Sequence, residues 1–197
     1  LGAEHLLKKR AKSNIVKKKI SQAVDFQSNF AKSKGIDLLG NNPGHQNIKS
    51  GLSTIEEKSL GNIAKSGSKI IQNVIDWAEK PNTKGMFLMH APAYAPESLS
   101  GFSSAGCQIT LFSTGVGNSF NNLIAPSIKY SGNPEVCRNL THQLDFKCSE
   151  VFLGKKSIDE AAIELWDLMI EICSGSLTWG EVLNESSEVF SRIDRSL

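Results

Sequence analysis

Residues 107–134 decide the fold of this chain, and they read CQITLFSTGVGNSFNNLIAPSIKYSGNP. Two short stretches in this segment, 107–112 and 127–130, are each followed at once by a polar loop that contains glycine. A short run that ends at such turn residues is typical of a strand. The segment therefore predicts two strands, whose ends carry the loops 113–118 and 131–134.

The alternation of strands with helices continues on both sides of this segment. Residues 86–89 form an apolar run that ends at His90-Ala91-Pro92 and predicts a strand, and residues 146–153 contain a weaker one. Helices are expected at 96–105, 134–143, 157–173 and from 178 onward. Strands that alternate with helices form parallel βαβ units, so we expect one doubly wound α/β layer over residues 85–173.

The residues before this layer are predicted to be mostly helical, at 3–11, 14–34, 54–66 and 69–79. The second of these helices is amphipathic, with apolar side chains along one face and lysines opposite. We therefore expect a small helical segment, residues 1–40, followed by an α/β domain, residues 41–197. The helical segment is a candidate dimerisation element, and a homodimer is expected.

The composition limits the classes of function. Apolar residues make up 40% and charged residues 21% of the chain, as in ordinary globular proteins. The net charge of +2 and the lack of a recognisable binding module argue against nucleic-acid binding, and no apolar run is long enough to span a membrane. We find no signal peptide, and the four cysteines are widely spaced, which favours reduced thiols in the cytoplasm.

The stretch 41–61, NNPGHQNIKSGLSTIEEKSLG, joins a polar loop to the start of a helix. Thr54 and Glu57 have the spacing of a capping box, in which two side chains satisfy two backbone N–H groups. Glu57 and Lys58 then lie beside the exposed N–H groups of a helix N-terminus, which attract anions. The stretch is a candidate site for a carboxylate-bearing ligand, although a polar loop before an ordinary surface helix has the same pattern.

Polar groups also follow the predicted strands. Open parallel sheets bind ligands outside the carboxyl ends of their strands, where His90 and the loops 113–118 and 131–134 are expected. The loop 113–118 offers two hydroxyls and glycine N–H groups to phosphate or carboxylate oxygens, but it lacks the Walker lysine and the third glycine of a dinucleotide fingerprint. His90 is a candidate general acid or base, or a metal ligand. A glycine-eased turn and a hydrogen-bonded histidine are the structural alternatives for these two features.

Five motifs, in the correct order, resemble the carboxy-terminal region of the altronate and galactarate dehydratases, with sulfolactate sulfo-lyase as a close relative. They are 52–61 with Asn42, Pro43 and Asn47 before it, 87–92, 98–101, the 113–118 loop, and Ile128-Lys129 with 131–134. The resemblance implies a lyase that removes water from a sugar acid to give a 2-keto-3-deoxy acid, with divalent iron. It also implies a Rossmann-like parallel sheet flanked by helices, of which this chain would hold a fragment. Residues 41–197 would then be a partial catalytic domain.

The resemblance also implies roles for individual residues. The catalytic candidates are Glu57, Lys58 and His90, of which Glu57 and His90 are also candidate ligands of Fe2+. The substrate-binding candidates are Asn42, Asn47, Thr54, Ser113, Thr114, Gly115, Gly117 and Asn118. The sequence departs from the family pattern at 44–48 and at His90, where an acidic residue often stands. A carbon–sulfur lyase of the sulfolactate type, a non-catalytic module for sugar-acid binding or assembly, and nucleotide binding at the 113–118 loop remain alternatives.

Overall fold

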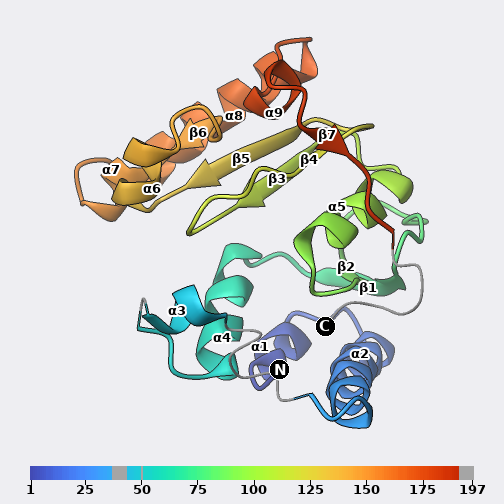
Figure 1. Cartoon of the computed structure of the whole chain (residues 1–197). Coiled ribbons are helices and arrows are strands. Elements are labelled where there is room, and N and C mark those ends of the chain that lie inside the picture. Colours follow the sequence, from blue (N-terminus) through green and yellow to red (C-terminus); the bar gives the residue numbers. More distant parts are fainter. Residues whose placement is uncertain (37–43, 50, 191–197) are drawn as a thin grey trace. The chain divides into compact units, whose positions relative to one another are not determined.

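The computed structural model describes residues 1–36, 44–49 and 51–190, and Figure 1 shows its elements. These residues form two compact units, 1–94 and 95–190, each of which contains parallel strands and helices. The predicted α/β class is therefore confirmed. No helix within the described ranges combines the length and the apolar character that crossing a membrane requires.

Helices and a small parallel sheet make up the first unit. Its described elements are α1 (Glu4–Lys9), α2 (Asn14–Ser33), α3 (His45–Lys49), α4 (Ile55–Lys65), β1 (Ile71–Asp76) and β2 (Met86–His90). The two strands run parallel, and Asp76 at the end of β1 lies opposite His90 at the end of β2. Helix α2 packs on this sheet through Val16 and Ile20, which share a buried apolar cluster with Ile71.

Strand β1 lies where the sequence predicted a helix at 69–79, and that prediction is wrong. Ile71 and Ile75 are both buried and are four residues apart. This spacing fits one turn of a helix, but it fits one face of a strand equally well, because strand side chains alternate between faces. Pairing with β2 decides in favour of the strand, and the β-branched residues of this segment suit that conformation. Helix α3 lies where a loop was expected.

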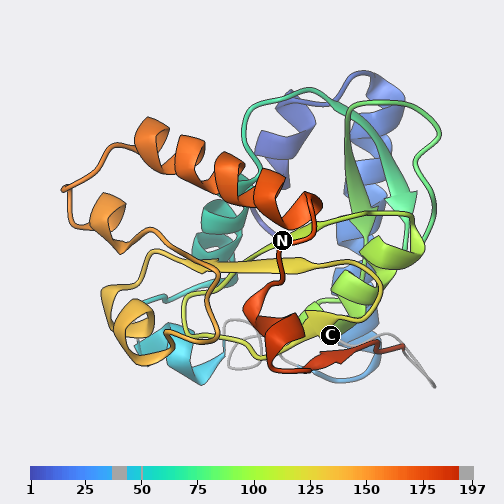
Figure 2. The same cartoon turned by 90° about the horizontal axis from the view of Figure 1, so that it is seen from above.

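The second unit is built around a three-stranded parallel sheet in the order β3-β5-β6. Its described elements are α5 (Ala95–Ser104), β3 (Thr110–Ser113), β4 (Asn121–Asn122), β5 (Ser127–Ser131), α6 (Pro134–Asn139), β6 (Phe146–Lys147), α7 (Ser149–Phe152), α8 (Ile158–Cys173), α9 (Trp179–Val182) and β7 (Ser186–Ser187). Strands β4 and β7 form a separate parallel pair. Helix α8 runs alongside the central strand β5 (Figures 1 and 2).

The predicted single layer over residues 85–173 is divided in the structure. Strand β2 pairs with β1, whereas the strands predicted at 107–112 and 127–130 correspond to β3 and β5, which pair with each other. The weaker strand expected within 146–153 is confirmed only at Phe146–Lys147, since Ser149–Phe152 is helical.

Two helices expected in the second unit, at 157–173 and from 178 onward, begin with capping boxes. Ser157 and Glu160 form a complete capping box at the start of α8, and Thr178 and Glu181 form another at α9. In each, the hydroxyl accepts a backbone N–H and the carboxylate accepts the N–H of the cap residue. The second box makes Trp179 the first residue of helix α9.

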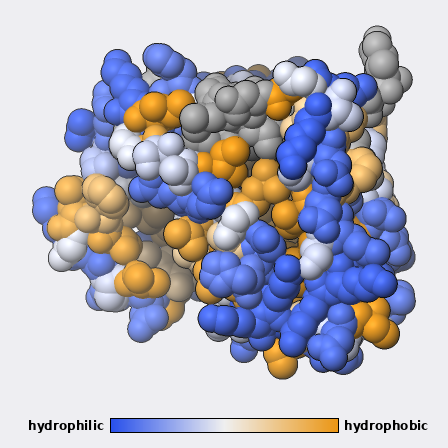
Figure 3. Space-filling model, turned by 90° about the horizontal axis from the view of Figure 1, so that it is seen from below, coloured by the Kyte–Doolittle hydropathy of each residue, from blue (hydrophilic) through white to orange (hydrophobic). Residues whose placement is uncertain are grey.

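The predicted domain division at residue 40 and the dimerisation role of residues 1–40 stay predictions. In the structure, α2 belongs to the same compact unit as β1. Its solvent face includes the exposed side chains of Lys17 and Lys18. Hydrophilic residues cover much of the right-hand side of the molecule when it is seen from below (Figure 3). The exposed lysines of α2 agree with the amphipathic pattern read from the sequence for this helix.

Candidate active site

Two of the predicted loops meet at the carboxyl ends of β3 and β5. The backbone N–H of Thr114 donates to the Tyr130 carbonyl oxygen at 3.0 Å. The side-chain Nδ2 of Asn133 donates to the Gly115 carbonyl oxygen, also at 3.0 Å. Of the three features expected together at strand ends, the loops 113–118 and 131–134 are in contact within the second unit, whereas His90 ends a strand of a separate sheet.

The loop 113–118 is shaped by its own side chains. Thr114 Oγ1 accepts the backbone N–H of Gly117 at 2.9 Å, and Asn118 Oδ1 accepts that of Phe120 at 2.9 Å. These bonds use side-chain oxygens that the sequence assigned to substrate. The half-buried Ser113 hydroxyl has no hydrogen-bond partner among the described residues. Ser113 is accordingly the loop hydroxyl with the most unused bonding capacity for a ligand.

Gly117 has a conformational reason to be glycine. Its φ is +91°, a region that residues with a side chain rarely adopt, and a Cβ built there would collide with the Leu140 side chain. Gly115, by contrast, is exposed and has open space where a Cβ would lie. Position 117 therefore requires glycine, whereas position 115 has room for a side chain, a difference that the sequence pattern does not reveal.

Asn133 is the residue that joins the two loops, and its replacement gives a first test. Its Nδ2 bonds Gly115, and its Oδ1 accepts the Glu135 N–H at 3.0 Å and so caps helix α6. Asn133→Ala is expected to lower the free energy of unfolding by about 1–2 kcal/mol, because an N-cap and a loop contact are both lost. Denaturant unfolding measures this loss. Asn139→Ala, at an exposed position at the end of the same helix, is the matched control, and an equal loss in both variants would contradict the joining role.

Thr54 and Glu57 are brought together, but not as a complete capping box. Thr54 Oγ1 accepts the Glu57 N–H at 3.1 Å, as predicted. Glu57 Oε2, however, accepts from the backbone N and the Oγ of Ser53, at 2.9 and 3.0 Å, rather than from the N–H of Thr54. The backbone N–H of Ser53, helped by its hydroxyl, lowers the pKa of Glu57. A carboxylate held in this way is a weaker base.

Lys58 and Asn47, which were predicted separately, are also in contact. Lys58 Nζ donates to Asn47 Oδ1 at 3.1 Å, and the same oxygen accepts the backbone N–H of Gly44 at 3.2 Å. Burial lowers the pKa of Lys58, and the nearby Lys65 lowers it further. The contact ties helix α4 to the segment before it, so the ammonium is held in one place. Asn42 lies outside the described residues.

His90 lies between two cavities of the first unit. One, of about 300 Å³, is lined mainly by apolar side chains from α1, α2 and β2, and the other, of about 290 Å³, includes Lys19, Asp76 and Glu79. The Phe26 ring meets the imidazole edge to face, with 5.1 Å between ring centroids. A histidine between an apolar and a charged space is suited to moving a proton.

The catalytic candidates Glu57 and Lys58, which also belong to the first unit, lie apart from these two cavities. Neither cavity has Glu57 or Lys58 among its lining residues. Within the described ranges, no group of three or more His, Cys, Asp or Glu side chains is placed to hold a metal ion. Glu57 and His90 are therefore not part of such a group, and their role as ligands of Fe2+ stays a prediction.

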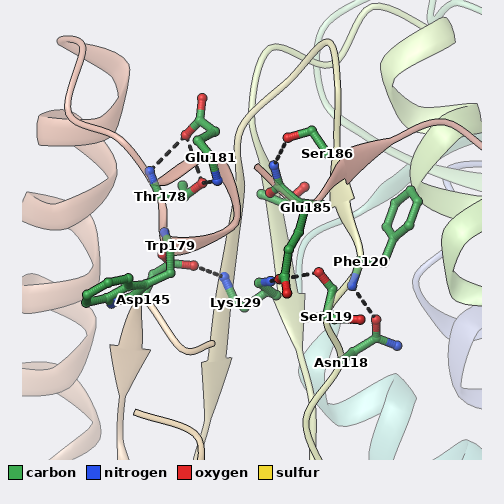
Figure 4. A network of polar contacts seen from close by, with 12 residues as sticks. Asn118, Ser119, Phe120, Lys129, Asp145, Thr178, Trp179, Glu181, Glu185 and Ser186 are labelled. Carbon is green, nitrogen blue, oxygen red and sulfur yellow. Dashed lines mark hydrogen bonds and ion pairs between the residues drawn. The ribbon is translucent and has the colours of Figure 1, made fainter. Parts of the chain in front are cut away.

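Sequence reasoning missed a buried polar network in the second unit (Figure 4). Asp145 accepts two backbone N–H groups, with Lys129 N at 2.7 Å from Oδ2 and Trp179 N at 2.7 Å from Oδ1. The Lys129 side chain is fully buried; its Nζ donates to the Ser119 carbonyl oxygen at 3.1 Å and lies 4.0 Å from Glu185 Oε2. Burial raises the pKa of Asp145, while its backbone donors and Lys129 oppose that rise. A lysine between Ile128 and Tyr130 in a buried strand was the signal available in the sequence.

Several known proteins are similar to this chain over most of its length. The family model for the carboxy-terminal region of D-galactarate/altronate dehydratase matches residues 1–195. The beta subunit of (2R)-sulfolactate sulfo-lyase from Chromohalobacter salexigens is 32% identical over 197 residues, covering 99% of this chain and 51% of that protein. Altronate dehydratase from Bacillus subtilis is 35% identical over 179 residues, or 89% of this chain and 35% of that protein.

Galactarate dehydratase (L-threo-forming) from Escherichia coli is 28% identical over 175 residues, which are 88% of this chain and 33% of that protein. The chain thus spans about half the length of the sulfo-lyase subunit and about a third of the length of the two dehydratases. The family match covers both units and every described candidate residue. The chain belongs to the D-galactarate/altronate dehydratase family and corresponds to its carboxy-terminal region.

Proposed function

We propose that this chain is the carboxy-terminal part of a hydro-lyase that dehydrates a sugar acid, such as altronate or galactarate, to a 2-keto-3-deoxy acid. The observation that carries the proposal is the family match over residues 1–195. The junction of the loops 113–118 and 131–134 supports it, because hydroxyls and loop amides suit the many oxygens of a sugar acid. The whole protein's activity is part of the proposal, since the relatives are longer.

The reaction needs a group that removes the proton next to the carboxylate, and groups that hold the carboxylate while charge develops. We assign the first role to His90, since the pKa of Glu57 is lowered by its bonds to Ser53 and the carboxylate is the weaker base. We assign the second role, binding of the substrate carboxylate, to Lys58, whose ammonium donates to Asn47. Ser113 and the remaining loop groups are assigned to the substrate hydroxyls.

Divalent iron remains part of the proposal, because the resemblance to the dehydratases implies it. The described residues do not supply three ligands in one place. A homodimer and a cytoplasmic location also belong to the proposal, and the free thiols of all four cysteines support the second.

The test uses the full-length polypeptide that contains this chain, supplied with ferrous iron and a reductant. Release of keto-deoxy acid from altronate and from galactarate is measured. His90→Gln is expected to lower kcat by about 10²–10⁴-fold, the usual contribution of a general base. His142→Gln, at an exposed position, is the matched control. Absence of keto-deoxy acid from both substrates would contradict the proposed reaction, and full activity of His90→Gln would contradict the role of His90.

A second candidate is a carbon–sulfur lyase acting on sulfolactate. It is favoured by the match to the sulfo-lyase subunit, which covers 99% of this chain. The same preparation is offered sulfolactate, and release of sulfite without dehydration of either sugar acid would favour this reaction. Binding of a sugar acid by this chain with no turnover, restored by the remainder of the protein, would instead indicate a module for binding or assembly.

A further inference from the structure

Lys129 occupies a position where a charge is costly. It lies in the middle of β5, the central strand of the second unit's sheet, and its side chain is 0% exposed. Removing an ammonium group from water costs several kcal/mol unless its partners compensate. An apolar side chain would fill the same space without that cost, so the ammonium itself needs an explanation.

The ammonium has few partners. Nζ makes one hydrogen bond among the described residues, to the Ser119 carbonyl oxygen at 3.1 Å. Its nearest counter-charge, Glu185 Oε2, is 4.0 Å away, and that oxygen atom is itself buried without a hydrogen bond. Burial lowers the pKa of Lys129, and Glu185 and Asp145 oppose this. The interaction that fixes where the ammonium lies is therefore the bond to Ser119.

This bond has a counterpart at the other end of the 113–118 loop. The loop begins where the Thr114 N–H donates to the Tyr130 carbonyl oxygen, and it ends where Ser119 accepts from Lys129. Its two ends are thus attached to consecutive residues of the same central strand. Since β5 is paired on both sides, it is a rigid support for a binding loop.

We propose that Lys129 is a positioning residue that fixes the 113–118 loop on the central strand, with Glu185 as its counter-charge. Its relevance to sugar-acid binding rests on the proposed function, whereas its effect on the loop does not. Glu185 lies between α9 and β7, so the last described elements of the second unit take part in shaping the loop.

The test compares Lys129→Met with Lys147→Met, in which an exposed lysine of the neighbouring strand β6 is replaced. Amide hydrogen exchange is followed in peptides from 113–120 and, as a reference, from α8. In Lys129→Met the loop peptides are expected to exchange roughly tenfold to a hundredfold faster relative to α8, the loss that a charge-assisted hydrogen bond represents. Unchanged exchange in the loop, or an equal increase in α8, would refute positioning and indicate a general packing role.

Glu185→Gln keeps the test decisive if Lys129→Met does not fold. The Glu185 side chain is 32% exposed, so this variant removes charge without a large change in packing. The loop is again expected to exchange faster than α8, by a smaller factor than in Lys129→Met. The double variant is expected to add little to Lys129→Met, because the two groups act together. Independent, additive effects would refute the role of Glu185 as counter-charge.

Binding of galactarate by the full-length protein, measured by calorimetry, separates this proposal from the proposed function. If the wild type binds galactarate and Lys129→Met binds it about tenfold more weakly, both the positioning role and the sugar-acid assignment stand. If the wild type does not bind but the loop loosens in Lys129→Met, positioning stands and the sugar-acid assignment fails. If the wild type binds and neither affinity nor loop exchange changes in Lys129→Met, positioning fails and the assignment stands.

Discussion

Asp145→Ala is expected to destabilise the second unit by about 2–5 kcal/mol, because two backbone N–H groups lose a charged acceptor. The carboxylate accepts from Lys129 on β5 and from Trp179 at the start of α9, each at 2.7 Å. Alanine can replace neither bond. Asp145→Asn retains one acceptor oxygen and is expected to lose less.

Chemical denaturation followed by hydrogen exchange of peptides from each unit measures this loss separately in the two units. Asp167→Ala, at an exposed position on α8, is the matched control and is expected to change stability by no more than about 0.5 kcal/mol. If Asp145→Ala lost no more than this control, the carboxylate would not be what joins β5 to α9.

Gly117→Ala is expected to cost about 2–4 kcal/mol, since the left-handed backbone and the added methyl group are both unfavourable. The φ of +91° disfavours any side chain, and the Leu140 side chain occupies the place of the new Cβ. The loop must shift, and we expect its peptide amides to exchange faster as well. Thermal unfolding and hydrogen exchange check the two effects.

Gly115→Ala supplies the control in the same loop. This position is exposed, its φ is not positive, and the added methyl group meets no neighbouring atom within 4 Å. Its stability is expected to stay the same or to rise slightly, because alanine restricts the unfolded chain. Equal losses in the two variants would mean that the loop tolerates no side chain for a reason other than the geometry of Gly117.

The elements that the sequence predicted well are those whose signals are local. The boxes at Ser157 and Thr178 specify helix starts within four residues, and the stretches that form β3 and β5 end at turn residues. Strand β1 was mistaken for a helix because the spacing of Ile71 and Ile75 is common to both conformations. Only its pairing with β2 resolves the choice, and such pairing is not encoded locally.

The candidate site shows the same limit. Proximity of the two loops followed from the rule for parallel strand ends and is confirmed by the bond from Asn133 to Gly115. The polar network that holds the loop 113–118 was not predicted. Lys129 within a strand was a signal, but its partners Asp145 and Glu185 lie 16 and 56 residues further along the chain and resemble surface residues. The joint roles assigned to Glu57, Lys58 and His90 stay predictions, since those residues belong to separate contacts in the first unit.

The pairing of β4 with β7 has a consequence for how the second unit folds as it is made. The Nδ2 of Asn121 donates to Ser186 Oγ at 2.8 Å, and the N–H of Val189 donates to Ser100 Oγ, also at 2.8 Å. The first and last parts of the unit are therefore bonded across 89 positions of the chain. A nascent chain that has not yet reached residue 189 cannot complete these bonds. The second unit is thus expected to finish folding only after residue 189 has been made, and contacts of such long range slow the process.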